Sequence, residues 1–192
     1  LADTWAFAGS LTWPRNGQVA VLLGNGKVMV SGGAYAARTE QYEPAANQWY
    51  ALGYGASHDG GATATLLPDG RVLVAGGRFG TTPSGSTLFY HPLTYSWTAG
   101  PSMTWHRYGH RATLLADGRV LVVGGYGAGG QALPVTEIFD PVTDTWTRVG
   151  DTGRPPYDHA LVPLPDGDVL AVGGNGVDRF DAVVGGWWNV GQ

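Results

Sequence analysis

The sequence predicts an all-β fold made of four similar antiparallel sheets, and three observations support this prediction. First, a phrase of Asp-Gly or Asn-Gly, a short apolar run and Gly-Gly occurs four times, at residues 25–33, 69–77, 117–125 and 166–174. Second, an aromatic residue precedes a tryptophan by seven positions in every copy. Third, 32 of the 192 residues are glycine and only 14% are charged, which favours turn-rich β-structure over helix. The phrases begin 44, 48 and 49 residues apart, in the range of propeller-blade repeats.

Each repeat contains four segments with strand character. The first is small and apolar and leads into the Asp-Gly or Asn-Gly turn, which is the strongest short hairpin signal because both residues tolerate positive φ. The second is a continuous apolar run ending at Gly-Gly, which indicates burial on both faces. The third centres on the aromatic residue and the fourth begins at the tryptophan. These pairs are Tyr42 and Trp49, Tyr90 and Trp97, Phe139 and Trp146, and Phe180 and Trp187. Their constant spacing predicts tryptophans that pack in the core or between sheets.

The length of the repeat varies at one place. Each Asp-Gly or Asn-Gly lies 20 residues after a tryptophan, whereas the segment between Gly-Gly and the third strand has a different length in every copy. Connections in an antiparallel meander alternate between two ends, so these variable segments share one face with the residues that approach each first strand. We call this the loop face, and we call the opposite face, with its Asp-Gly and Pro-containing turns, the turn face. Insertions confined to one face often mark a binding face.

These repeats resemble the Kelch repeat of the β-propeller family that includes the galactose-oxidase superfamily. The resemblance rests on the four Gly-Gly pairs, on the aromatic residue seven positions before each tryptophan, and on the approach segment Arg107-Tyr108-Gly109-His110. It covers residues 5–188 and implies four-stranded blades around a central axis, with the first strand innermost. We therefore expect one domain over residues 1–192. Its blades are expected at about 14–53, 58–101, 106–150 and 155–192, with an extra outer strand at 1–9.

Both ends of the chain supply an outer strand. Residues 1–5 echo residues 142–146, so Trp5 opens an outer strand with no blade before it, and Trp187 opens another near the C-terminus. Propellers often close by letting an N-terminal strand complete the last blade, and either strand could take that place. Three interpretations follow: a closed four-bladed ring with one surplus strand, half of a larger ring formed by two chains, or a segment of a longer array. Kelch rings usually have more than four blades.

Charge and composition exclude several classes of partner and cofactor. The net charge is −4 and no basic stripe is present, so we expect neither nucleic acid nor an anionic membrane as a partner. No apolar run approaches the roughly 20 residues of a membrane span. The absence of cysteine excludes disulfides, Cys-ligated zinc and a thiol nucleophile. It also excludes the copper centre of galactose oxidase, which uses a tyrosine cross-linked to cysteine. We expect no cofactor and no metal.

We place any specific site on the loop face. Aromatic rings occur there near Arg, His and Asp side chains, a combination that suits a polar small molecule, a sugar or an extended peptide. The candidate ligand-binding residues are Trp13, Arg15, His58, Asp59, Arg78, Phe79, Trp105, His106, Arg107, Tyr126, Arg154, Tyr157 and Asp158.

Several chemically suggestive residues have a structural explanation. His110 and His159 begin the inner strands of adjacent blades and could hold a metal with His106 or Asp158, but the resemblance implies that the Arg-x-x-His pattern is mostly structural. The acidic residues of the Asp-Gly phrases precede glycine and are interpreted as turn formers. Residues 124–130 superficially resemble a phosphate-binding loop, but no helix follows to point its N-terminus at an anion.

The interpretation that we favour is a non-catalytic binding module whose loop face contacts a protein or a glycan. A homodimer that forms one larger ring is a further prediction. The first alternative is a carbohydrate-directed isomerase or lyase without copper, with Arg107, His106, His110, Asp158 and His159 as candidate groups. The second is a purely structural or engineered propeller fragment. We expect an extracellular or cell-surface location for the binding module. A fold alone does not establish a function, so these alternatives stay open.

Overall fold

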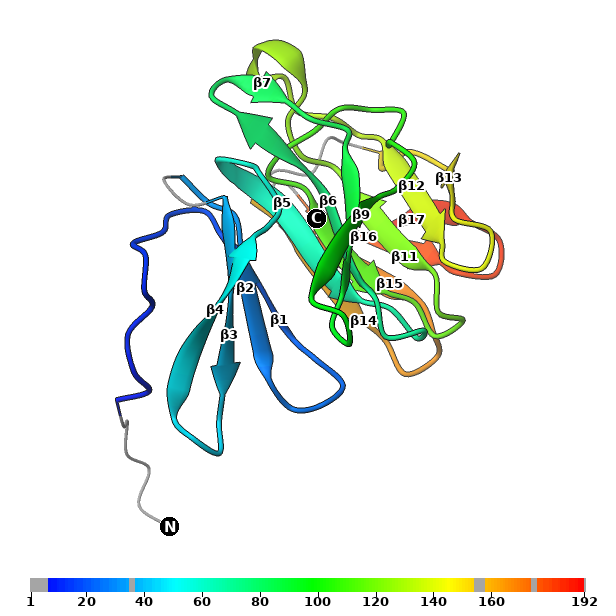
Figure 1. Ribbon diagram of the computed structural model, residues 1–192. Coiled ribbons are helices and arrows are strands. Elements are labelled where there is room, and N and C mark those ends of the chain that lie inside the picture. The colour runs from blue at the N-terminus through cyan, green and yellow to red at the C-terminus, as the bar shows by residue number, and fades with distance from the viewer. Residues whose placement is uncertain (1–6, 35–36, 154–157, 174–175, 192) are drawn as a thin grey trace.

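The fold consists of four antiparallel sheets, which form the four blades of a propeller (Figure 1). The computed structural model describes residues 7–34, 37–153, 158–173 and 176–191, and these residues contain no α-helix. In every blade the strands pair in chain order, and every pairing along this order is antiparallel. The predicted all-β fold of four four-stranded blades is therefore confirmed. None of the described residues forms a helix that is long and apolar enough to cross a membrane.

The strand bounds of each blade are as follows. Blade 1 consists of β1 (Val19–Leu22), β2 (Val28–Ser31), β3 (Arg38–Glu43) and β4 (Gln48–Tyr54). Blade 2 consists of β5 (Gly60–Leu66), β6 (Val72–Phe79), β8 (Thr87–His91) and β9 (Ser96–Ala99). Blade 3 consists of β10 (Arg111–Leu114), β11 (Val120–Val123), β12 (Thr136–Asp140) and β13 (Thr145–Arg148), with a short 3-10 turn, η1 (Ala128–Gly130), between β11 and β12. Blade 4 consists of β14 (Ala160–Pro163), β15 (Val169–Gly173), β16 (Gly176–Asp181) and β17 (Gly186–Gly191).

Blade 2 has a fifth strand that the repeat pattern does not predict. β6 continues past its Gly-Gly pair to Phe79 and then turns back into β7 (Thr82–Pro83). Arg78 pairs with Pro83, and Phe79 pairs with Thr82. The variable segment of this repeat is long enough to fold back on the strand that precedes it. Its length was visible in the sequence, but its pairing was not.

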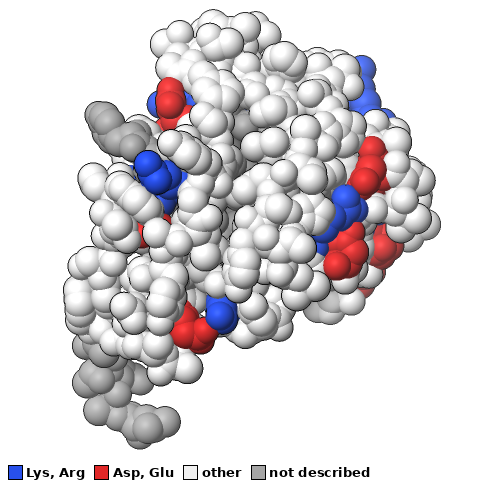
Figure 2. Space-filling model, viewed as in Figure 1, with Lys and Arg blue, Asp and Glu red and all other residues white. Residues whose placement is uncertain are grey.

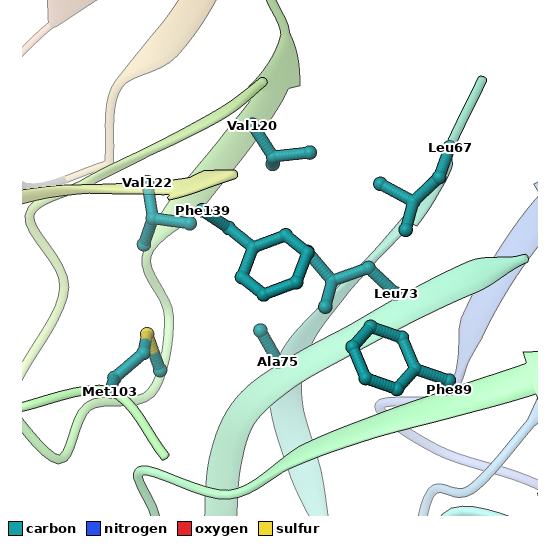
Figure 3. Close-up of a cluster of buried hydrophobic side chains, with 8 residues drawn as sticks. All are labelled: Leu67, Leu73, Ala75, Phe89, Met103, Val120, Val122 and Phe139. Atoms are coloured by element: carbon teal, nitrogen blue, oxygen red, sulfur yellow. The ribbon is translucent and has the colours of Figure 1, made fainter. Parts of the chain in front are cut away.

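The blades stack on one another in chain order. The inner strands β1, β5, β10 and β14 contact each other in that sequence, and a hydrophobic cluster fills each of the three junctions. Figure 3 shows the cluster between blades 2 and 3, where Phe139 of β12 lies beside Leu73 of β6. The ring centroids of Phe139 and Phe89 are 5.7 Å apart. Val120 and Val122 of β11 complete the blade 3 side of the cluster.

The tryptophans join successive blades, as the constant spacing predicted. In blades 2, 3 and 4 the indole Nε1 donates a hydrogen bond to a threonine hydroxyl of the preceding blade. The pairs are Trp97 and Thr39 at 3.2 Å, Trp146 and Thr87 at 3.1 Å, and Trp187 and Thr136 at 3.0 Å. In blade 1, Trp49 donates instead to the backbone oxygen of Ala8 at 3.2 Å.

Of the two outer strands expected at the ends of the chain, the structure describes the C-terminal one. β17, which contains Trp187, is the outer strand of blade 4 and pairs with β16. Of the outer strand expected at 1–9, residues 7–9 are not part of a strand. The remainder of that segment, including Trp5, lies outside the described residues.

Candidate functional site

The turn face is uniform from blade to blade. In each Asp-Gly or Asn-Gly turn, the side-chain oxygen of the first residue accepts a hydrogen bond from the backbone nitrogen two residues later. The four pairs are Asn25 with Lys27 at 3.1 Å, Asp69 with Arg71 at 2.9 Å, Asp117 with Arg119 at 3.0 Å, and Asp166 with Asp168 at 3.2 Å. These are Asx turns, so the acidic residues form turns as predicted. A hollow of about 210 Å³ lies on this face beside Arg71, but Arg71 already pairs with Asp69 at 2.6 Å and with Asp144 at 2.9 Å.

The loop face contains a larger hollow, where the approach segments of blades 1 and 2 meet the loop after β6. Its volume is about 580 Å³. The residues that line it are Asn16, Gly17, Ala34, Asp59, Gly60, Gly61, Arg78 and Gly80. Two of the predicted site residues, Asp59 and Arg78, thus lie at one hollow. The glycines of this lining were not predicted, although the sequence shows three of them in the approach segments.

Glycine is required where two approach segments meet. Gly17 has φ of +76°, and a Cβ added there would lie 2.9 Å from the Cα of Gly60. Gly60 in turn has φ of +150° and faces the backbone of Gly17. A side chain at Gly17 would therefore push the two blades apart and fill the edge of the hollow. The close approach leaves main-chain groups as part of the hollow's wall.

Hydrogen bonds hold Asp59 in place, and a contact with an aromatic ring positions Arg78. The backbone nitrogen of Asp59 donates to the carbonyl oxygen of Arg78 at 2.8 Å, and the Asp59 carboxylate accepts a hydrogen bond from the backbone nitrogen of Gly80. The Arg78 guanidinium lies over the ring of Tyr108 at 5.1 Å from its centroid. The Tyr108 ring lies 5.6 Å from that of Tyr126, a further predicted site residue. Among the described residues, no carboxylate forms an ion pair with Arg78, which is exposed.

The sequence of blade 2 explains why Asp59 is available. In blade 3, the residue ten positions before the Asp-Gly turn is Arg107, and its side chain enters the blade to pair with Glu137. The corresponding residues in blade 2 are Asp59 and Leu88, which cannot form such a pair. Asp59 therefore stays exposed at the surface and contributes its carboxylate to the hollow.

The charges of the molecule lie in small neighbouring groups of opposite sign. The face drawn in Figure 2 is mostly uncharged, and its acidic side chains lie next to basic ones. No basic stripe crosses this face, in keeping with the low charge of the sequence.

Comparison with known proteins identifies the repeat. Residues 107–153, which include all of blade 3, match the model of the Kelch motif. One of the four blades therefore contains a Kelch motif. It is similar in structure to YjhT with a TM-score of 0.78 and 17% sequence identity, and the similarity covers 96% of this chain and 68% of the YjhT chain. At that identity the similarity concerns the fold. No curated protein matches the chain.

Two predicted ligand-binding arginines have side chains that lie inside the propeller and not at its surface. Arg107 and Glu137 form an ion pair of 2.7 Å, and both side chains are 0% exposed. Arg15 and Glu40 form the equivalent pair in blade 1, again at 2.7 Å and fully buried. Burial lowers the pKa of Arg107, and Glu137 opposes that effect. Because these guanidinium groups connect elements within one blade, we exclude both from the proposed site.

The predicted site residue His58 is also buried, with its ring packed against the Gly-Gly turn of blade 1. It is only 4% exposed, and a Cβ at Gly32 would collide with its Nε2. Burial lowers the pKa of His58 and so favours the neutral form of its ring. We therefore interpret His58 as a packing residue at the junction between blades 1 and 2 and exclude it from the proposed site.

The histidines of the inner strands are engaged in structural contacts. His110 Nε2 and Thr63 Oγ1 share a hydrogen bond of 3.0 Å across the junction between blades 3 and 2. Burial, followed by the charge of Arg107, lowers the pKa of His110 to about 3. Burial, followed by the charge of Arg111, lowers the pKa of His159 to about 4. Among the described residues, no group of three or more His, Asp or Glu side chains is placed to hold a metal ion.

The remaining predicted residues lie at other places on the molecule. Trp13 lies beside Arg38, whose guanidinium is 4.8 Å from the Trp13 ring centroid and 5.0 Å from that of Tyr54. Trp105 is contacted in the same way by Arg148 at 5.0 Å. Three exposed residues complete the set: Phe79 at the end of β6, His106 before blade 3, and Asp158 before blade 4. Arg154 and Tyr157 lie outside the described residues.

Proposed function

We propose that this Kelch-type propeller is a non-catalytic binding module and that the hollow around Asp59 and Arg78 contacts a protein or glycan ligand. A propeller of this kind generally serves as a binding or interaction module. The observation that carries the proposal is the exposed guanidinium of Arg78, which lies over Tyr108 at the edge of a hollow of about 580 Å³. The variable segments of the repeat lie on the same face.

The chemistry of the hollow suits a ligand with several hydrogen-bonding groups. Its volume falls within the range of about 300–1,000 Å³ that is usual for small-ligand sites. Arg78 offers guanidinium donors, Asp59 offers carboxylate acceptors, and the glycines leave the main chain accessible. Phe79, which follows Arg78 in the chain but does not line the hollow, is 47% exposed and offers apolar surface at the end of β6. One or two sugar rings, or the end of a side chain from a partner protein, fit this description.

The isomerase or lyase alternative relied on a set of groups that face one pocket. Arg107 and His110 are buried and bound within or between blades, and His159 is buried beside Arg111. These contacts give each group a structural role and do not favour a shared catalytic pocket. The absence of catalysis remains a prediction, which analysis of the bound ligand after prolonged incubation would test.

A glycan array and a displayed-peptide library would test the binding function directly. Selected ligands are titrated against the unchanged protein and the variants Arg78→Ala and Arg119→Ala, the second of which alters the turn face. We expect Arg78→Ala to weaken binding about tenfold or more, because it removes a charge-assisted hydrogen bond, and Arg119→Ala to have little effect. Unfolding curves for all three proteins separate binding effects from folding effects. Equal affinity of the Arg78→Ala variant and the unchanged protein would show that the ligand does not bind at this hollow.

A further inference from the structure

Blade 4 ends the stack with a sheet face that no described residue covers. The face of each blade that looks toward the next blade is called its forward face, and the opposite one its backward face. On the forward face of blade 4, Val172 of β15 is 40% exposed and Val162 of β14 is 44% exposed. The residues equivalent to Val172 in the other three blades are at most 1% exposed: Ser31, Ala75 and Val123. The same position is thus buried wherever another blade follows.

The forward face of blade 4 is mostly apolar, and its arginine is already paired. Trp188 and Val190 of β17 are 46% and 53% exposed, and they line a hollow of about 290 Å³ together with Arg179. Arg179 pairs with Asp166 at 2.8 Å and with Asp168 at 2.7 Å. Covering this face therefore buries no unpaired cation among the described residues. The carboxylate of Asp181, which also lines the hollow, has no cation but accepts hydrogen bonds from the backbone nitrogens of Val183 and Val184 at 2.9 and 2.8 Å.

Blade 1 begins the stack with the opposite kind of open face. On its backward face Leu22 is 62% exposed, and Val28 and Tyr42 are only partly buried. The residues equivalent to Val28 and Tyr42 in the other blades are at most 1% exposed: Val72, Val120, Val169, Tyr90, Phe139 and Phe180. Exposed apolar patches of this kind mark interaction surfaces.

The two open faces correspond to the two sides of every junction inside the molecule. At the junction of blades 1 and 2, Met29 of the forward face packs with Tyr90 of the backward face. Blade 4 has Leu170 at the position of Met29, and blade 1 has Tyr42 at the position of Tyr90. Both residues are partly exposed in the structure. The forward face of blade 4 and the backward face of blade 1 therefore carry the kinds of residue that pack together at the internal junctions.

We propose that the forward face of blade 4 in one copy of this chain packs against the backward face of blade 1 in a second copy. The second copy is the occupant because it carries the required blade, with valine and tyrosine at the positions that fill the internal junctions. The contact joins different surfaces of the two copies, so it produces a closed ring if the rotation closes and a longer string if it does not. This proposal is independent of the ligand site on the loop face.

Light scattering after size-exclusion chromatography, over a wide range of concentrations, tests the proposal. We expect masses above the 20.1 kDa of one chain that increase with concentration. Leu22→Asp removes the backward contact and Val172→Asp removes the forward contact, so each variant alone should be a monomer. An equal mixture should give a heterodimer that grows no further, because one intact face of each kind remains. Leu93→Asp alters a residue that is 95% exposed on the turn face and should leave assembly unchanged.

Three outcomes would overturn the proposal. A single-chain mass at every concentration would mean that the end faces do not pair. Assembly by Leu22→Asp alone would mean that blade 4 pairs with its own kind, and failure of the mixture to form heterodimers would mean that the two faces are not complementary. Circular dichroism and thermal unfolding of each variant establish that it is folded before its mass is interpreted.

Discussion

Arg107 shows how a single residue organises a blade of this propeller. Its guanidinium is fully buried, 2.7 Å from Glu137 Oε2, and it donates hydrogen bonds to the carbonyl oxygens of Gly124 at 3.0 Å and Val135 at 2.8 Å. Glu137 also accepts a hydrogen bond from the backbone nitrogen of Thr104 at 2.8 Å. The pair therefore fastens the approach segment and the variable loop to β12, and its stabilising effect depends on both partners being present.

Removal of one partner should cost far more stability than removal of an exposed ion pair. Arg107→Ala leaves the Glu137 carboxylate buried without its cation, so we expect the free energy of unfolding to fall by about 3–5 kcal/mol. The control is Arg148→Ala, because the Arg148 side chain is 51% exposed in its pair with Asp151. We expect that variant to lose about 1 kcal/mol or less. Urea denaturation measures both values, and equal losses would contradict the structural role given to Arg107.

The sequence could have predicted this buried pair. Arg15 and Arg107 each lie ten positions before the Asn-Gly or Asp-Gly turn of their blade, and Glu40 and Glu137 each lie two positions before the aromatic residue. Arginine and glutamate occur together at these positions in blades 1 and 3, and neither occurs in blade 2. This joint occurrence indicates contact between the two residues. The arginines were interpreted as ligand-binding residues because each position was considered by itself.

At the scale of the elements, the seven-residue spacing from aromatic to tryptophan sets the register of the outer hairpin. It places Tyr90 opposite Trp97 and Phe139 opposite Trp146 across the strand pair. The tryptophan then faces the preceding blade, where its indole nitrogen meets a threonine hydroxyl. The spacing was sufficient to predict the joint. The strand β7 was not predictable in the same way, because the length of a loop does not specify its pairing.

The tryptophan–threonine hydrogen bond should couple neighbouring blades. Trp146 Nε1 donates to Thr87 Oγ1 at 3.1 Å and to the backbone oxygen of Pro101 at 3.0 Å. We expect Trp146→Phe and Thr87→Val each to lower the free energy of unfolding by about 1 kcal/mol. The double variant should lose less than the sum of the two, since both changes remove the same hydrogen bond.

Trp49 provides the matched control for this coupling. Its indole donates to Ala8 and not to a threonine of another blade. The losses in the free energy of unfolding caused by Trp49→Phe and Thr87→Val, measured by urea denaturation, should therefore be additive. Additive losses for Trp146→Phe with Thr87→Val would show that the inter-blade hydrogen bond does not contribute to stability.

At the scale of the whole molecule, the sequence predicts the blades better than the site. Repeat spacing is a local property, so the four sheets and their strand order follow from it. The hollow at Asp59 and Arg78 forms where backbone segments from two blades converge, through the close approach of Gly17 and Gly60. Residue spacing along the chain does not determine such a convergence. The same limit applies to the end faces, whose exposure depends on how the blades stack.

The buried histidines make the stability of the whole propeller depend on pH in a defined direction. Burial and then Arg107, Arg111 and His159 lower the pKa of His110 from 6.5 to about 3 in the folded protein. Burial also lowers the pKa of His159, to about 4. Between these values and about pH 6.5, the unfolded chain binds protons that the native state does not. Stability is therefore full above about pH 6.5 and falls as the pH decreases toward 4.

Urea denaturation at pH 7 and at pH 5 measures this loss. His110 should contribute up to about 1.4 kcal/mol for each pH unit within the window. His110→Gln retains a group that can bond to Thr63 and does not titrate, so its stability should depend less steeply on pH. His91→Gln serves as the control, because His91 is bonded to Thr98 at an exposed site, and it should keep the slope of the unchanged protein. An equal slope for His110→Gln and the unchanged protein would show that the ring of His110 accepts a proton inside the fold at little cost.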